Sequence, residues 1–114
     1  MNKNIIGLDW DGVVSDYGAA FSYLVQLFQH CIIITVNDTI THEIAADVLN
    51  IEKDKISIEI CPDNRIVDYP TWKAEKCLKH HVDIMFDDDP NVVLACQEEE
   101  ILAITVSEYI YRYG

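Results

Sequence analysis

Short apolar segments alternate with segments of helical periodicity along the chain, and this alternation restricts the fold more than any other feature of the sequence. Five apolar or β-branched runs predict strands at residues 4–9, 31–36, 56–60, 82–87 and 101–106. Apolar residues at helical spacing predict helices at residues 16–30, 41–50, 71–81 and 90–100. Strands that alternate with helices of this length are typical of βαβ units, which form parallel sheets through right-handed crossovers.

We therefore predict an α/β fold with a Rossmann-like, three-layer α/β/α architecture and a parallel sheet of about five strands in the order 3-2-1-4-5. The runs "CIIITV" and "VDIMF" are almost continuously apolar, as expected for strands that are buried on both faces. The chain of 114 residues suits one domain, 1–114, and half of its residues are hydrophobic, which is enough for a core.

Composition narrows the class of partner. The chain has 8 basic and 20 acidic residues, and this net charge of −12 disfavours binding to nucleic acid or to an anionic membrane surface. The apolar runs are too short to span a membrane. The four cysteines lack CxxC and cysteine–histidine metal spacing, and no secretory segment precedes them. We expect reduced, mostly buried thiols in a cytoplasmic protein.

Carboxylates follow the first and fourth predicted strands. Asp9 ends the first and Asp11 comes two residues later, while Asp87 ends the fourth and Asp88 comes directly after it. Each acidic pair alone is typical of a turn or a helix cap, and we assign that role to Asp16, Asp38 and Asp89. In a sheet of this order the two strand ends lie side by side at the ligand-binding crevice, where like charges about 4 Å apart repel by about 4 kcal/mol at an effective dielectric near 20. Hard oxygen ligands without Cys or His predict Mg²⁺.

With "GLDWDGVVSD" and "DIMFDDDP" after these strands, the chain resembles the haloacid dehalogenase (HAD) superfamily of aspartate-nucleophile phosphatases along nearly its whole length. The first family motif, an apolar strand followed by D-x-D-G, is matched at Asp9 and Asp11. The fourth motif is matched in its double-aspartate form by Asp87 and Asp88, not in the commoner G-D-x-x-x-D form. Which of these two aspartates binds metal directly is left open.

The second and third motifs have candidates as well. Thr35 stands where the family has Ser or Thr at the end of the second strand. Lys73 and Lys76 compete for the lysine that precedes the fourth strand. We favour Lys73, because a cation in the first turn of a helix opposes the helix dipole by about 0.3–1 kcal/mol and so suggests a role at a phosphate. A solvated surface lysine is the competing interpretation, and for Lys76 it is the better one.

The resemblance implies a Mg²⁺-dependent phosphomonoester hydrolase. Asp9 would attack phosphorus and form an aspartyl-phosphate, and Asp11 would protonate the leaving oxygen and later activate water. The implied metal ligands are the Asp9 carboxylate, the Asp11 main-chain carbonyl and Asp88, and Asp87 would lie close by or also bind the metal. The residues implied to bind the phosphoryl group are Thr35 and Lys73. Two alternatives stay open: a regulatory module that binds metal or phosphate with little or no turnover, and a phosphotransferase.

The chain lacks room for the cap domain that many family members carry, so it resembles a capless member. An open crevice suggests a bulky phosphorylated substrate, a nucleotide end, or closure by a second copy in a homo-oligomer. Trp10, between the two aspartates, is expected either to stack on a base or sugar or to pack against the following loop. Tyr109, Tyr111 and Tyr113 alternate in the tail, which suggests either an edge strand that pairs with another copy or a half-buried terminal strand.

Overall fold

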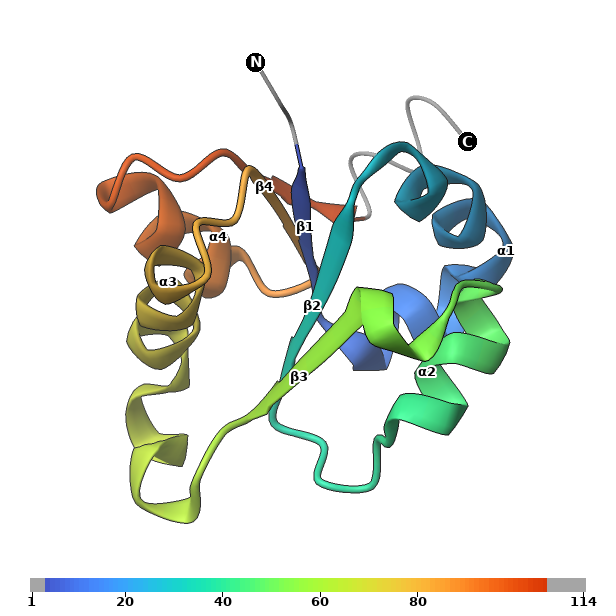
Figure 1. The fold of residues 1–114 in the computed structure, drawn as a ribbon. Helices are drawn as coiled ribbons and strands as arrows, with labels where there is room; N and C mark the ends of the chain where they lie inside the picture. Colours follow the sequence, from blue (N-terminus) through green and yellow to red (C-terminus); the bar gives the residue numbers. More distant parts are fainter. Residues whose placement is uncertain (1–3, 107–114) are drawn as a thin grey trace.

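The computed structural model describes residues 4–106, which fold around one five-stranded parallel sheet (Figure 1). The strands are β1 (Ile5–Leu8), β2 (His30–Thr35), β3 (Ile56–Ile60), β4 (Ile84–Asp87) and β5 (Ala103–Thr105). They are arranged in the order β3-β2-β1-β4-β5, which confirms the predicted topology. In the middle of the sheet, Leu8 of β1 pairs with Ile33 of β2 on one side and with Phe86 of β4 on the other.

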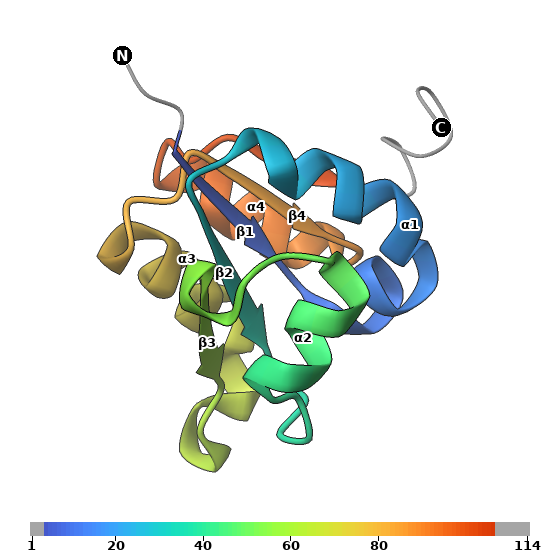
Figure 2. The same ribbon diagram turned by 45° about the vertical axis from the view of Figure 1, so that its right-hand side comes forward.

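Two pairs of helices cover the two faces of the sheet, as expected for three layers (Figures 1 and 2). The helices are α1 (Ser15–Leu24), α2 (His42–Leu49), α3 (Tyr69–Lys79) and α4 (Pro90–Glu98). Helices α1 and α2 lie on one face, and α3 and α4 lie on the other. Each face has its own hydrophobic cluster, which in the first includes Phe21 and Leu49 and in the second Trp72 and Val92.

Strand β2 shows why the sequence here is an isoleucine run. Cys31 and Ile33 pack into the cluster under α1 and α2, whereas Ile32 and Ile34 pack into the cluster under α3 and α4. Successive side chains of a strand point to opposite faces, so a strand covered on both faces needs apolar residues at every position. All four cysteines of the chain are likewise buried, with free thiols, as predicted.

Several predicted boundaries shift. The helix expected over residues 16–30 ends at Leu24 and is followed by one 3₁₀ turn, Val25–Leu27, because β2 already begins at His30 to pair with β1. The helix expected from residue 71 begins at Tyr69, with a proline in its first turn, where the missing N–H has no partner to lose. Asp89 caps α4 as predicted: its carboxylate accepts a hydrogen bond of 2.9 Å from the N–H of Asn91.

The segments that connect the strands are short. Each connection between consecutive strands of residues 4–106 contains one α-helix, with or without short 3₁₀ or π-helical turns, and no inserted cap domain. In the same part of the chain no helix has the length and apolar character needed to cross a bilayer. The tail tyrosines Tyr109, Tyr111 and Tyr113 lie outside the described residues.

Candidate active site

The first and fourth strands bring two carboxylates together at the carboxyl edge of the sheet. Asp87 is the last residue of β4, and Asp9 directly follows β1. The N–H of Asp9 donates a hydrogen bond of 3.0 Å to the carbonyl of Phe86, which extends the pairing of the two strands by one residue. Both carboxylates are buried. Parallel pairing of neighbouring strands therefore fixes the two aspartates side by side.

A buried lysine lies between these carboxylates. Lys73 projects from α3, and only 2% of its surface is exposed. Its ammonium lies 2.8 Å from Oδ2 of Asp87 and 3.1 Å from Oδ1 of Asp9. Lys76, the other candidate, lies elsewhere: its ammonium is 5.7 Å from the centre of the Trp72 ring and 4.0 Å from Glu59. The structure thus places Lys73, and not Lys76, at the acidic cluster.

Burial shifts the pKa values of these three side chains. Burial raises the pKa of Asp9 to about 7, because the lowering effect of Lys73 does not offset it and Asp87 raises the pKa further. Burial also raises the pKa of Asp87, against the lowering effect of Lys73. Burial alone lowers the pKa of Lys73, but the two carboxylates outweigh this and hold it above its ordinary value. The lysine is therefore held as a cation between two acids that are poorly solvated.

The roles of the adjacent aspartates Asp87 and Asp88 differ. Asp87 uses both of its oxygens within the protein: Oδ2 accepts from Lys73, and Oδ1 accepts a hydrogen bond of 3.0 Å from the N–H of Asp89. Asp88 is exposed, and its carboxylate lies close to those of Asp9 and Asp87, with one oxygen from each within 4.8 Å of the others. This all-oxygen donor set fits a hard divalent cation such as Mg²⁺. Asp88 and Asp9 are the two carboxylates best placed to bind such a cation, because Asp87 already uses both of its oxygens within the protein.

The turn after β1 depends on its glycine. Gly12 has φ +78°, a left-handed conformation that a residue with a Cβ adopts at a cost. A Cβ at this position would also collide with the carboxylate of Asp88. The glycine of the D-x-D-G sequence thus lets the turn approach the acidic cluster closely. Trp10, in the same turn, is buried in the core, so it packs inside the protein and does not offer a stacking surface.

Asn37 holds Asp11 in place. Asp11 is exposed, and the side-chain amide of Asn37 lies 3.2 Å from both of its carboxylate oxygens. The N–H of Asn37 in turn donates a hydrogen bond of 3.0 Å to the hydroxyl of Thr35. Thr35 is buried at the end of β2 and contributes to the site through Asn37. The sequence prediction missed Asn37, although an amide two residues beyond a strand that ends at the same edge of the sheet was the available signal.

The acidic residues line a pocket of about 390 Å³. Its lining consists of Asp9, Asp11, Lys73, Asp87, Asp88 and Asp89, together with Val36, Ile66 and Tyr69; Thr35 is not part of it. The hydroxyl of Tyr69 donates a hydrogen bond to Asp89, and this bond, together with burial, raises the pKa of the phenol to about 12. Tyr69 and Ile66 were not predicted. Ile66 lies in the segment before α3 and Tyr69 is the first residue of α3, and the proximity of both to Asp9 is a product of the tertiary fold.

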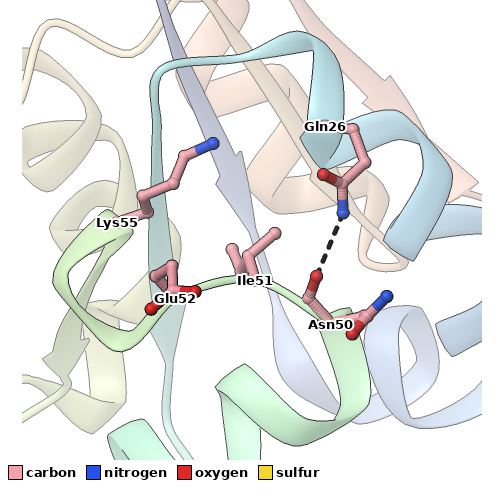
Figure 3. Close-up of a pocket in the computed structure, with 5 residues that line it drawn as sticks. All are labelled: Gln26, Asn50, Ile51, Glu52 and Lys55. Carbon is pink, nitrogen blue, oxygen red and sulfur yellow. Dashed lines mark hydrogen bonds between the residues drawn. The ribbon is translucent and has the colours of Figure 1, made fainter.

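A second pocket, of about 270 Å³, lies beside the segments that lead into β2 and β3 (Figure 3). It is lined by Gln26, Asn50, Ile51, Glu52 and Lys55. The side chain of Gln26 donates a hydrogen bond of 3.2 Å to the carbonyl of Asn50 (Figure 3). Its single carboxylate and single ammonium do not form a cluster comparable to that at Asp9.

The chain was compared with known proteins. No protein-family model matches it, and no match was found among curated proteins or solved structures.

Proposed function

We propose that the protein is a Mg²⁺-dependent phosphomonoesterase of the haloacid dehalogenase type that acts through an aspartyl-phosphate. The observation that carries this proposal is the cluster at one pocket of a buried Asp9, a buried Lys73 and an exposed Asp88. These residues occupy positions 9, 73 and 88, and each matches a motif by which the chain resembles that superfamily. The five-stranded parallel sheet in the order β3-β2-β1-β4-β5 is compatible with it.

In the proposed reaction, Asp9 is the nucleophile. Its Oδ1 accepts a hydrogen bond of 2.8 Å from the N–H of Trp10 and pairs with the ammonium of Lys73 at 3.1 Å. One oxygen of the Asp9 carboxylate attacks phosphorus. A bond forms between this oxygen and phosphorus, while the ester bond between phosphorus and the leaving oxygen breaks. The second step is hydrolysis, in which water attacks phosphorus, the bond to Asp9 breaks, and inorganic phosphate leaves.

Asp11 carries the proton in both steps. As an acid it gives its proton to the leaving oxygen, and as a base it takes a proton from the attacking water. Its exposure and its two contacts of 3.2 Å with the Asn37 amide suit this role, because the side chain is oriented and still reaches the solvent. Asn37 is therefore a positioning residue in this proposal.

Charge stabilisation comes from Lys73 and from the metal. The Lys73 ammonium is held at the pocket by Asp87, where it would neutralise the oxygens of the transferring phosphoryl group. Mg²⁺ held by Asp9, Asp88 and the Asp11 carbonyl would supply further positive charge to the same oxygens. Thr35 is buried and supports Asn37, and its direct binding of phosphoryl oxygens stays a prediction from the resemblance.

The experiment is phosphate release from p-nitrophenyl phosphate with Mg²⁺ and with EDTA. We expect metal-dependent release by the wild type and its loss in Asp9→Asn. Asp16→Asn is the matched control, because Asp16 is an exposed carboxylate in the first turn of α1, outside the pocket lining. Release that survives in Asp9→Asn or in EDTA would contradict the mechanism. Metal binding by a folded wild type without release of phosphate would support the binding module in its place.

A further inference from the structure

The pocket that contains the acidic cluster also has an apolar portion. Val36 follows β2, Ile66 comes from the segment that leads into α3, and Tyr69 is the first residue of α3. Val36 and Ile66 are 42% and 41% exposed, so both apolar side chains contribute accessible surface to the pocket. The proposed mechanism uses none of these three side chains. They are therefore available to contact the leaving group of the substrate, which is the part attached to the phosphoryl group.

The charged groups of the pocket limit the charge that this leaving group can carry. Among residues 4–106, the pocket lining has five aspartates and one cation, Lys73. Arg65, next to Ile66, is engaged elsewhere, because its guanidinium pairs with Asp68 at 2.9 Å and with Glu75 at 3.1 Å. Mg²⁺ and the dianion of one phosphoryl group carry opposite charges of equal size, so the lining stays acidic when both are bound. A second anionic group on the substrate would therefore be repelled.

The apolar side chains of the pocket point in the same direction. The sugar hydroxyls or additional phosphates of a nucleotide need polar partners, which Val36 and Ile66 do not provide. The lining therefore favours a substrate with an apolar leaving group over a nucleotide.

We propose that this pocket selects monophosphate esters with an uncharged, apolar leaving group, and that Ile66 and Val36 determine this specificity. The proposal rests on the phosphatase assignment for the position of the phosphoryl group at Asp9, Lys73 and Asp88. It concerns recognition, so binding of non-hydrolysable phosphonates tests it separately from turnover. The distinguishing chemical features are the apolar surface of the leaving group and the absence of a second negative charge.

The test is titration calorimetry of the full chain with Mg²⁺ and three probes. Methylphosphonate supplies the anionic group alone, phenylphosphonate adds an apolar ring, and 4-carboxyphenylphosphonate adds a negative charge to that ring. We expect phenylphosphonate to bind about tenfold more tightly than methylphosphonate, because the ring buries apolar surface. The carboxylated probe is expected to lose that advantage. Equal affinities for the first two probes, or tightest binding of the carboxylated probe, would overturn the proposal.

Two variants locate the effect. Ile66→Ser is expected to remove most of the preference for phenylphosphonate over methylphosphonate. Val67→Ser is the matched control, because Val67 is the adjacent residue, is 95% exposed and does not line the pocket. It is expected to keep the preference of the wild type. Both positions are exposed, so the melting temperatures should stay close to that of the wild type. An unchanged preference in folded Ile66→Ser would refute the assignment.

The outcomes separate recognition from catalysis. The wild type could prefer phenylphosphonate and yet release no phosphate from p-nitrophenyl phosphate. This result would refute the phosphatase activity and support the proposed ligand specificity. The wild type could instead release phosphate and bind phenylphosphonate and methylphosphonate equally. This result would support the phosphatase activity and refute the proposed ligand specificity. If no phosphonate binds in the presence of Mg²⁺, the proposed ligand specificity is refuted as well.

Discussion

Lys73 of α3 donates a hydrogen bond of 2.8 Å to Oδ2 of Asp87 at the end of β4, and both side chains are almost completely buried. This ion pair joins a helix to the edge of the sheet and places the same ammonium 3.1 Å from Asp9. Replacing a buried pair by apolar residues is often tolerated, whereas removing one partner leaves a charge that is neither solvated nor paired. Lys73 is therefore important for stability as well as for the proposed chemistry.

Lys73→Ala is expected to lower the free energy of unfolding by about 3–5 kcal/mol, because it leaves Asp9 and Asp87 buried without a cation. Lys76→Ala, on the same helix, removes a partly exposed lysine and is expected to cost less than about 1 kcal/mol. Urea denaturation at neutral pH measures both values. Similar losses in the two variants would show that the buried pair contributes little.

Asp88→Asn is expected to remove the stabilisation by Mg²⁺ and to leave the metal-free protein almost unchanged, because Asp88 is exposed. A ligand at 100 times its dissociation constant stabilises the folded state by about 2.7 kcal/mol, so the wild type should melt at a higher temperature with Mg²⁺ than with EDTA. Asp87→Asn should instead lower the melting temperature with or without Mg²⁺, because Lys73 loses its shorter ion pair. A full response to Mg²⁺ in Asp88→Asn would exclude Asp88 as a ligand.

Gly12→Ala is expected to destabilise the protein by about 1–2 kcal/mol, because a left-handed conformation is costly for a residue with a Cβ. The new Cβ would also displace the carboxylate of Asp88, so the melting-temperature shift with Mg²⁺ should shrink. Gly12→Asn separates the two effects, because asparagine tolerates this conformation better and carries the same Cβ. We expect a smaller loss of stability in Gly12→Asn and the same loss of the Mg²⁺ response.

The stability contributed by Glu59 is expected to depend on pH. Burial raises the pKa of Glu59, but hydrogen bonds with His80, at 2.6 Å, and Lys79, at 3.0 Å, outweigh it and hold the pKa below its ordinary value of 4.5. The unfolded chain therefore binds this proton more readily than the folded chain. The contribution is present above pH 4.5 and is lost as the pH falls through the folded pKa.

Denaturation of the wild type and of Glu59→Gln across this pH range tests the expectation. The difference in unfolding free energy between them should be largest near neutral pH and should shrink as the solution becomes acidic. Glu99→Gln, which changes an exposed glutamate just after α4, should show a difference that varies less. A difference for Glu59→Gln that stays constant with pH would rule out the proposed linkage.

The fold could be predicted from the sequence because two periodicities alternate along it. A strand buried on both faces must be apolar throughout, and the isoleucines of β2 make that pattern unambiguous. The end of α1 could not be predicted in the same way. Leu27 continues the helical apolar pattern, yet it is 76% exposed and lies in a 3₁₀ turn, because the chain must turn there to begin β2 beside β1.

For the candidate site, the sequence was informative where a carboxylate directly follows a strand. Val36, which directly follows β2, was missed because an apolar residue there gives no such signal. Asp9 and Asp88 were predicted because the carboxyl ends of β1 and β4 meet at one edge. Ile66 and Tyr69 were missed, since their segment has no periodic pattern that relates it to that edge. Asn37 was missed because its role depends on one side-chain contact with Asp11, which only the path of the chain beyond β2 creates.

The pairing of β1 with β4 also has a consequence for synthesis on the ribosome. Leu8 pairs with Phe86, and at roughly 5–20 residues per second the second of these is added about 4–16 s after the first. During that interval the nascent chain contains Asp9 and Asp11 but neither Asp87 nor Asp88, and β1 lacks the neighbour that completes the middle of the sheet. The acidic cluster is thus assembled only after β4 has been synthesised, and an intact cluster reports that the chain has grown beyond β4.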